Sequence, residues 1–157
     1  MSLHETLDIT GRLTLRMHAP DGRVVDERVA HNDITVHGRE LVARLFNATV
    51  QAEVPRVSRM CVGSGDRKFA ETDNALVAPV GCTPITSVEE STVTDANGKT
   101  RHRLRITGEL GEKDCNGELR EAGLFTARDE VMYNRVTFKP INKSPEFQLT
   151  LVWDILF

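Results

Sequence analysis

Three carboxylates that follow a glycine-rich turn are the residues in this chain best suited to chemistry. Asp66, Glu71 and Asp73 come soon after the run Gly63-Ser64-Gly65. Carboxylate oxygens are the ligands that hard cations such as Ca²⁺ and Mg²⁺ prefer. Acidic residues in a polar loop are more often a solvated surface, and we favour that interpretation. We therefore expect no metal site and no cofactor.

The histidines do not form a recognisable catalytic arrangement. His31 and His37 could approach each other near the start of a helix, but their spacing matches no common ligand pattern, so we expect solvated loop histidines. The sequence lacks G-x-S-x-G, H-E-x-x-H and the phosphate-binding P-loop. The stretch V-G-S-G-D-R has only two of the glycines of a dinucleotide fingerprint. We therefore expect no catalytic residues and no enzyme.

A row of arginines is the most one-sided charge feature. Arg101, Arg103 and Arg105 alternate with His102 and Leu104, which places the arginines on one face of a predicted strand. The row could meet an acidic partner or a phosphate backbone. We favour pairing with carboxylates of a neighbouring strand, and the candidates are Glu89 and Glu90. With a net charge of -3, a pI near 6.0 and no aromatics between the arginines, nucleic acid is not an expected partner.

The cysteines and the apolar runs limit the setting of the protein. Cys61, Cys82 and Cys115 are odd in number and lack C-x-x-C spacing, which argues against a disulfide framework and a zinc site. We expect small core or loop thiols in a reducing cytoplasm. No stretch approaches the roughly 20 apolar residues of a membrane span, and the N-terminal residues do not resemble a signal peptide.

Period-two patterns predict a mainly β chain with one helix. Apolar and polar residues alternate over several short runs that end in Gly, Pro, Asn or Asp. The expected strands are 9–19, 24–29, 57–62, 84–90, the run around 102–106, 118–125, 131–138 and 147–157. Turns are expected at Ala19–Arg23 and Asp95–Gly98. One helix is expected after an N-cap at Thr35, because Leu41, Val42, Leu45 and Phe46 have helical spacing.

These elements favour an antiparallel β-sandwich or barrel-like domain with one α-helix and an N-terminal β-hairpin. We expect residues 1–50 to form the hairpin and helix, as a possible arm packed on the main domain. Residues 51–157 would form the β-sandwich attachment domain. At 157 residues the chain is long enough to bury a core without staples.

The last predicted strand is the most hydrophobic. Its alternation buries one face, and Val152 and Leu156 make part of the second face apolar. A strand covered on both sides is either central in its sheet or placed against another subunit, and an exposed strand of this kind would invite aggregation. Trp153 and Phe157 are therefore interface candidates.

Several segments in a fixed order resemble a known family. They are V-S-R-M-C-V-G-S-G (57–65), E-T-D-N-A-L (71–76), G-E-L-R-E-A-G-L-F (117–125) and Y-N-R-V-T-F-K-P (133–140). Their order resembles the N-terminal domain of phage tail-collar fibre proteins and related tail and baseplate proteins of contractile phages. The resemblance covers about residues 57–157. The chain departs from the family by an extra hairpin and helix at its start, and it stops where a fibre would continue.

The resemblance implies attachment to a virion and brings no catalytic residues. We expect a non-enzymatic structural protein of a tail, collar or neck, or baseplate, assembled in the host cytoplasm and located in the virion. Its partners would be further copies of itself and other virion structural proteins, with no membrane partner. Symmetric assemblies of this kind bury apolar edges on neighbouring subunits.

Residues in the resembling segments add further candidates. Gly63 and Gly65 would serve a loop with positive φ or a close approach to another backbone, and Gly123 would mark a bulge or close packing. We favour fold maintenance as the role of these glycines. Arg120 and Glu121 could pair across a subunit boundary, and Phe125 is a further interface candidate. Within one subunit, Glu118 and Glu121 could instead be surface charge or pair with Arg120 or Arg135.

Two other functions compete with the virion hypothesis. The first is a carbohydrate- or receptor-binding β-sandwich module, which needs exposed aromatics, yet Tyr133 and Trp153 both fall in predicted strands. The second is a small hydrolase or metal-dependent enzyme, which the missing motifs disfavour.

Overall fold

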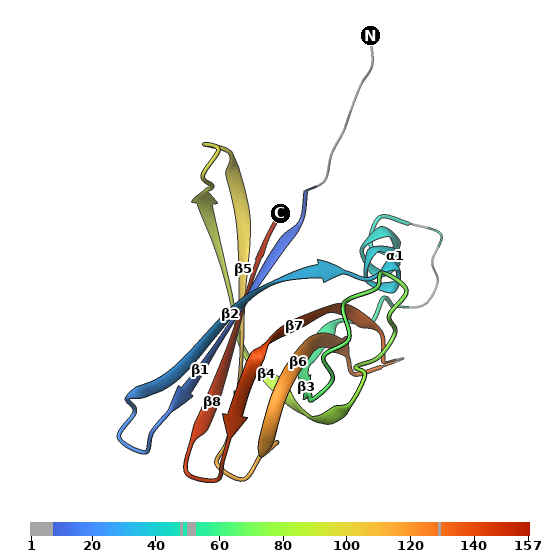
Figure 1. Cartoon of the computed structure of the whole chain (residues 1–157). Helices are drawn as coiled ribbons and strands as arrows, with labels where there is room; N and C mark the ends of the chain where they lie inside the picture. Colours follow the sequence, from blue (N-terminus) through green and yellow to red (C-terminus); the bar gives the residue numbers. More distant parts are fainter. Residues whose placement is uncertain (1–7, 48, 50–52, 129) are drawn as a thin grey trace.

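The computed structural model describes residues 8–47, 49, 53–128 and 130–157. Eight strands and one helix lie within these residues and follow one another in the order shown in Figure 1. The bounds are β1 Thr10–His18, β2 Val24–Ile34, α1 Val36–Arg44, β3 Val57–Gly63, β4 Pro79–Thr94, β5 Thr100–Leu110, β6 Gly117–Thr126, β7 Met132–Lys143 and β8 Gln148–Leu156. The predicted mainly β chain with one helix and an N-terminal hairpin is confirmed.

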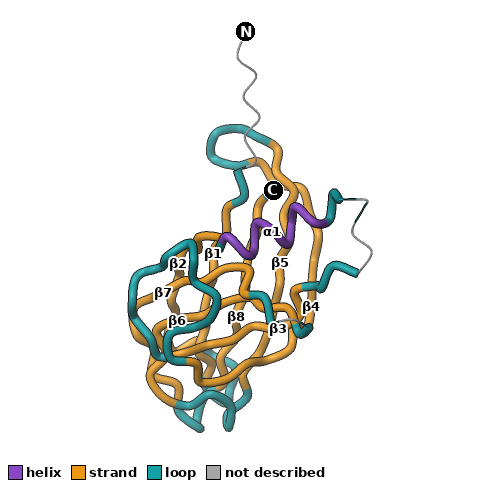
Figure 2. The backbone as a smooth tube through the Cα atoms, turned by 90° about the vertical axis from the view of Figure 1, so that its right-hand side faces the viewer, coloured by secondary structure: helices purple, strands orange, loops and turns teal. Residues whose placement is uncertain are grey.

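The strands close into an antiparallel barrel in the order β1-β2-β7-β6-β3-β4-β5-β8. Figure 2 traces the strands around this barrel, with α1 toward one end of it. β4 serves two neighbours in turn: residues from Pro79 to Pro84 pair with β3, and residues from Ile85 to Thr94 pair with β5. β2 pairs with β1 over most of its length and with β7 only at Asp33 and Ile34.

The N-terminal hairpin forms part of the barrel wall. β1 pairs with β8 along its whole length, from Thr10 opposite Leu156 to His18 opposite Gln148. β1 and β2 are therefore two strands of the barrel and do not form an arm packed on it. The predicted boundary near residue 50 falls inside one continuous barrel. The physical reason is that β8 needs a partner on each edge, and β1 supplies one of them.

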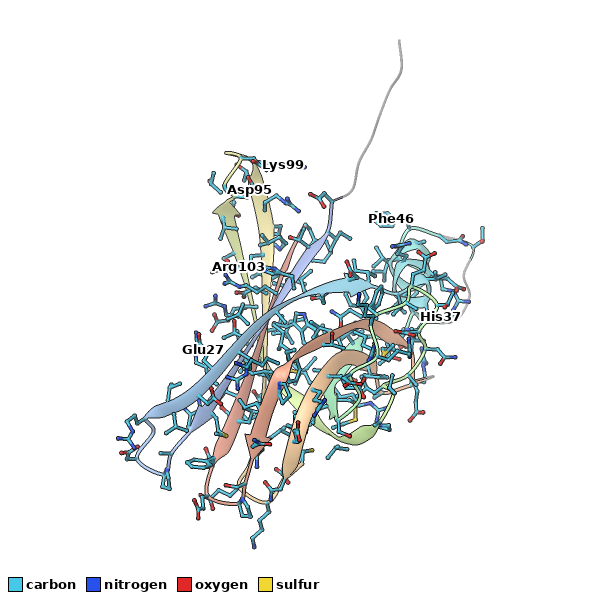
Figure 3. All side chains as sticks on the ribbon, in the orientation of Figure 1. Glu27, His37, Phe46, Asp95, Lys99 and Arg103 are labelled. Atoms are coloured by element: carbon cyan, nitrogen blue, oxygen red, sulfur yellow. A yellow bond between two sulfur atoms is a disulfide. The ribbon has the colours of Figure 1, made fainter. Side chains whose placement is uncertain are left out.

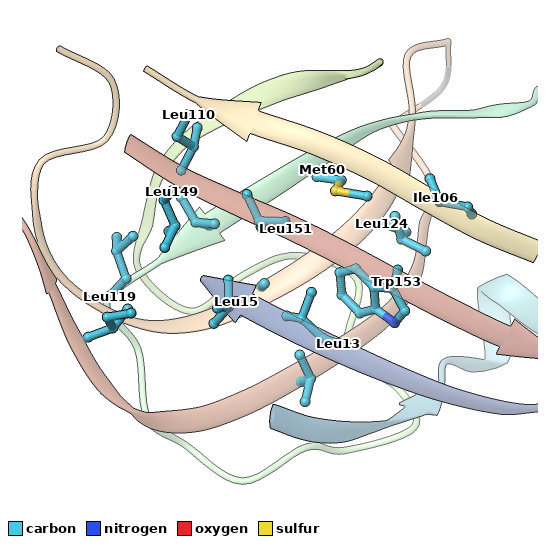
Figure 4. Packing of buried hydrophobic residues seen from close by; sticks show 14 of the residues in the cluster. Leu13, Leu15, Met60, Ile106, Leu110, Leu119, Leu124, Leu149, Leu151 and Trp153 are labelled. Atoms are coloured by element: carbon cyan, nitrogen blue, oxygen red, sulfur yellow. The ribbon is translucent and has the colours of Figure 1, made fainter. Parts of the chain in front are cut away.

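The core fills the inside of the barrel with side chains from every second position (Figure 4). Leu149, Leu151 and Trp153 of β8 are fully buried and pack with Leu13 and Leu15 of β1. The indole N–H of Trp153 donates to Oδ1 of Asn32 over 2.6 Å, which satisfies the polar atom of this large side chain. β8 lies between β1 and β5, so of the two positions expected for this strand the structure shows the central one.

The helix begins where the sequence predicts. The Thr35 side chain accepts a hydrogen bond from the Gly38 amide over 2.9 Å and caps α1. Gly38 lies so close to β7 that an added Cβ would be 2.2 Å from the carbonyl oxygen of Tyr133. Leu41 is buried, whereas Leu45 and Phe46 follow the helix and are exposed. The predicted apolar face is therefore only partly buried.

The predicted turns are confirmed. The Asp95 amide donates to the Lys99 carbonyl and the Gly98 amide donates to the Asp95 carbonyl, which closes the β4–β5 hairpin. Gly98 has φ of +78°, a conformation that glycine adopts without strain.

The prediction of separate thiols is wrong for two of the cysteines. Cys61 and Cys82 form a disulfide between β3 and β4, and Cys115 is free. The two residues are directly opposite each other in the strand register, with Cα atoms 3.9 Å apart. The spacing in sequence gives no sign of this pairing, because the register of two strands brings the sulfurs together.

Candidate functional site

The segment from Ser64 to Ala78, called the β3–β4 connection, is held against the barrel by one buried carboxylate. Glu121 of β6 is fully buried. Its Oε1 accepts hydrogen bonds from the amides of Gly65 (3.1 Å) and Ala78 (2.8 Å), and its Oε2 accepts one from Val77 (3.1 Å). One side chain therefore fixes both ends of this connection.

Arg135 of β7 neutralises Glu121 and extends the contact into the connection. Its Nε lies 2.8 Å from Oε2 of Glu121, and its Nη1 lies 3.3 Å from Oδ2 of Asp73. Its Nη2 donates to the carbonyl of Arg67 over 2.8 Å, so the guanidinium is surrounded by acceptors. We call Glu121, Arg135, Asp73 and Arg67 the charge network. Buried ions need such partners, because an unpaired charge in the interior is very costly.

Asp73 is the outer carboxylate of the charge network. Burial acts to raise the pKa of Asp73, but hydrogen bonds from the Ala70 amide and the Arg67 side chain and the charges of Arg67 and Arg135 outweigh burial and lower it. Asp73 is therefore charged at neutral pH and accepts hydrogen bonds from two arginines and a backbone amide.

The three acidic residues considered for a cation are each paired with arginine. Asp66 lies 3.0 Å from Arg120, and Glu71 lies 3.4 Å from Arg39. Asp73 belongs to the charge network. Within the part of the chain that the structure describes, no group of three or more His, Cys, Asp or Glu side chains could hold a metal ion.

The glycines named from the sequence are sites of close approach. An added Cβ at Gly63 would lie 2.5 Å from Oε1 of Glu121, and one at Gly65 would lie 2.5 Å from the Val77 Cβ. An added Cβ at Gly123 would lie 2.8 Å from the carbonyl oxygen of Asn134. Close packing, rather than a positive φ, is therefore the reason for glycine at these positions.

The interface candidates separate into buried and exposed residues. Glu121 and Trp153 are fully buried inside the subunit, so neither side chain is available to a partner, and Glu121 cannot pair across a subunit boundary. Phe125 is buried with Cys61, Leu76 and Met132. Glu121 and Phe125 are buried because this part of β6 contributes to the core. Sequence alone does not distinguish an inward carboxylate from an outward one.

The remaining candidates, Arg120 and Phe157, are at least partly exposed. Arg120 binds Glu118 and Asp66 on the surface. The Phe157 residue is 36% exposed. An interface role for these two residues stays a prediction.

The arginine row is largely paired within the subunit. Arg105 donates to Asp154 of β8 over 2.8 Å, and this bond, ahead of opposing burial, lowers the pKa of Asp154. Arg103 donates to Ser91, and the almost fully buried Arg101 lies 3.2 Å from Asp95. Glu89 is opposite Arg105 in the register, as predicted, but the direct partner is Asp154, which no pattern in the sequence indicates.

An apolar cleft lies between α1, residues 53–57 and the strands β5 and β8. It has a volume of about 710 Å³. Its apolar lining includes Leu41, Val42, Leu45, Phe46, Val54, Pro55, Val57, Leu104, Ile106, Leu124, Tyr133, Ile155 and Phe157. Leu45 is 68% exposed and Phe46 is 84% exposed, and both lie just beyond the last residue of α1. Figure 3 shows Phe46 at the periphery of the molecule, close to α1.

Tyr133 contributes a buried polar atom beside the apolar cleft. Its hydroxyl has no hydrogen-bond partner among the described residues, and burial raises the pKa of Tyr133 to about 12. The phenol therefore stays neutral at physiological pH and acts as part of an apolar wall.

The exposed rim of the cleft, formed by Leu45, Phe46 and Phe157, is the feature of the described residues best suited to binding. Large exposed apolar groups that gather in one place mark interaction sites more often than isolated ones do. The sequence carries the signal for Leu45 and Phe46, because their helical spacing is visible, but it assigns both to a buried face.

Comparison with known proteins gives no further assignment. No family model, no curated protein and no solved structure matches this chain. Among the described residues, no helix is both long and apolar enough to cross a bilayer.

Proposed function

We propose that this chain is a non-enzymatic structural protein of a phage tail, collar or neck, or baseplate, which associates with itself and docks onto a larger particle. The observation that carries the proposal is the apolar cleft with its exposed rim at Leu45, Phe46 and Phe157. Burial of apolar surface is the main favourable contribution to protein association. A partner that covers this rim would remove three large hydrophobic side chains from water.

The segments that resemble tail-collar and baseplate proteins also meet in space, which supports the proposal. Gly65 and Asp73 lie in or beside the first two segments, and they contact Glu121 of the third and Arg135 of the fourth. The motifs thus describe one structural unit, the charge network and the connection that it holds. A unit of this kind maintains a fold and needs no reaction chemistry.

Immunoelectron microscopy tests the particle assignment. Particles are sedimented from a culture that expresses the gene in its natural genome and are labelled with an antibody against the protein. We expect label at one position on the particles. Protein found only in the supernatant, with unlabelled particles, would reject a virion role.

A matched pair of variants tests the cleft. Phe46→Ser removes an exposed rim side chain and should reduce incorporation into particles, whereas Val29→Ser removes an exposed apolar side chain on β2 and should not. Equal incorporation of both variants would place docking elsewhere on the surface.

The carbohydrate-binding alternative has less support. Sugar-binding surfaces need exposed aromatic rings. Trp153 and Tyr133 are both buried in the barrel, which leaves Phe46 and Phe157 as the rings at the cleft that a sugar could reach. Specific binding of the isolated protein to glycans on an array would reverse this preference.

A further inference from the structure

Among the residues that the structure describes, the second half of β4 has a neighbouring strand on one side only. Residues from Ser87 to Thr94 pair with β5, while the pairing of β4 with β3 stops at Pro84. Among the described residues, no backbone hydrogen bond joins residues 87–94 to a strand other than β5. We call the outer side of residues 87–94 the β4 edge.

The pairing pattern identifies the backbone groups that face outward. Asp95 donates to Lys99 at the turn, so the alternate residues Val93, Ser91 and Glu89 form the hydrogen-bonded pairs with β5. His102, opposite Thr92, exchanges both of its backbone hydrogen bonds with Phe157 on the other side of β5, which agrees with this alternation. The N–H and C=O groups of Val88, Glu90, Thr92 and Thr94 therefore point out of the β4 edge.

The β4 edge is accessible. Figure 1 shows the β4–β5 hairpin projecting beyond the barrel, with no other strand along the outer side of β4 there. Val88 is 56% exposed, and Glu89, Glu90, Thr92 and Thr94 are exposed as well. The sequence S-V-E-E-S-T-V-T contains no Pro and no Lys, two residues that commonly protect edge strands from pairing, and its charged side chains are Glu89 and Glu90.

β2 shows how the same barrel closes a comparable edge. β2 pairs with β7 at only two residues, but the Arg28 guanidinium donates to the carbonyls of Lys139 and Pro140 of β7. A side chain thus spans the separation between these two strands. The described residues provide no such bridge at the β4 edge.

We propose that the β4 edge pairs antiparallel with the β4 edge of a second copy of this chain, around a two-fold axis at Ser91. Strand addition satisfies the outward backbone groups. The inference rests on the self-association part of the proposed function and identifies the surface that carries it.

Charge excludes an axis at Glu89, Glu90 or Thr92, and of the other positions an axis at Ser91 pairs the most residues of the β4 edge. A two-fold axis perpendicular to a sheet pairs residues that lie on the same face, so the residue on the axis meets its own copy. An axis at Glu89 or Glu90 places that carboxylate opposite itself, and an axis at Thr92 places Glu89 opposite Asp95. Like charges directly opposite each other are destabilising.

An axis at Ser91 avoids these repulsions. Glu89 is then opposite Val93, and Glu90 is opposite Thr92. The outward-facing pairs are Glu90 with Thr92 and Val88 with Thr94, so the backbone groups that need partners face one another. Ser91 meets Ser91 of the second copy at a non-hydrogen-bonded position, where Cα atoms are about 4.5 Å apart.

Crosslinking of a matched pair of serine variants tests the axis. Ser91→Cys should form a covalent dimer under mild oxidation, because its Cα separation suits a disulfide. Ser87→Cys is on the same strand and face but would lie about 26 Å from its copy, at roughly 3.3 Å per residue, and should not crosslink. The unmodified chain provides the background from free Cys115.

Light scattering over a dilution series measures the association itself. We expect a dimer of the unmodified chain, and Thr92→Pro should raise the dimer dissociation constant at least about tenfold, because it removes an outward donor and leaves the bonds to β5 in place. Thr92→Ala, which keeps the amide, should dimerise normally. Urea unfolding verifies that the proline variant is folded.

Each contrary result has a distinct meaning. A monomer at all concentrations without Ser91→Cys crosslinks would overturn edge pairing, while label on particles would still support the virion role. An oligomer that tolerates Thr92→Pro, or that crosslinks equally through Ser87→Cys, would also overturn edge pairing and move self-association to another surface. Unlabelled particles together with a Ser91-linked dimer would reject the virion role and leave edge pairing standing.

Discussion

The β3–β4 connection and the projecting half of β4 are close in sequence, yet they differ in how their backbone N–H and C=O groups are satisfied. In the connection, the amides of Gly65, Val77 and Ala78 all donate to Glu121. In the projecting half of β4, a row of backbone groups faces outward, and the described residues supply no partner strand for it. This contrast fits the proposal that the β4 edge pairs with a second copy of the chain.

The apolar cleft is similar to the β4 edge in that both leave groups exposed at the surface. The connection is bound by buried charge, whereas the cleft exposes Leu45, Phe46 and Phe157. Substitutions in the charge network should therefore lower the free energy of unfolding, and substitutions at the cleft or the β4 edge should lower association while leaving stability unchanged.

Loss of Glu121 should have the largest effect. Glu121→Ala leaves Arg135 without its closest counter-ion and leaves three amides unsatisfied, so we expect the free energy of unfolding to fall by about 3–5 kcal/mol. Urea denaturation followed by tryptophan fluorescence measures the loss. Arg120→Ala, at the neighbouring surface position, should cost less than about 1 kcal/mol. Equal losses for both variants would contradict the central role of the buried carboxylate.

A methyl group at Gly65 should have the next largest effect. The Cβ would approach Val77 to 2.5 Å and Oε1 of Glu121 to 2.8 Å, so Gly65→Ala must displace the connection. We expect a loss of about 1–3 kcal/mol in the same denaturation assay. Gly111→Ala meets only the Asp114 side chain at 3.1 Å and serves as the control. An unchanged midpoint for Gly65→Ala would mean that the connection is not closely packed.

Acid should weaken the charged regions before it affects apolar contacts. The pKa values of Asp73 and Asp154 are lowered from 3.8, so their folded-state stabilisation is complete above that value and is lost as the pH falls through the lower, folded-state pKa. Urea midpoints measured from pH 7 to pH 2.5 should fall steeply at the acid end. Asp154→Asn should flatten this fall, whereas Glu146→Gln, on an exposed turn, should not.

Phe46→Ser should have the smallest effect on stability. Because Phe46 is 84% exposed, we expect a change within about 0.5 kcal/mol in the free energy of unfolding. Binding of a hydrophobic fluorescent dye to the cleft should nevertheless decrease. A loss of several kcal/mol would show that Phe46 packs within the subunit, and the contrast between the two regions would then fail at this position.

Sequence patterns predict the strands and turns well because these features depend on neighbouring residues. The alternation in residues 147–157, the turn at Asp95–Gly98 and the cap at Thr35 are all local and all confirmed. Barrel closure and the role of β1 as the partner of β8 depend on pairings between distant residues, which periodicity does not encode.

The candidate site was predictable only in part. The sequence suggests Arg135 as a possible partner of Glu121, and the glycines as points of close approach, but it does not distinguish a buried carboxylate from a surface one. The Cys61–Cys82 disulfide and the Arg105–Asp154 ion pair depend on strand register, and no sequence motif predicts either of them. The β4 edge is visible only when every backbone hydrogen bond is assigned to a partner.

The pairing of β1 with β8 also has a consequence for the folding rate. Thr10 pairs with Leu156, so one seam of the barrel joins residues that are far apart in the chain. Contacts of such high sequence separation slow folding, because the entropy of a long loop is lost before the pairing is gained. During synthesis, the β1–β2 hairpin emerges from the ribosome long before β8 is available to it. We therefore expect the closing of this seam to be a late step, with the free edge of β1 exposed to chaperones until β8 arrives.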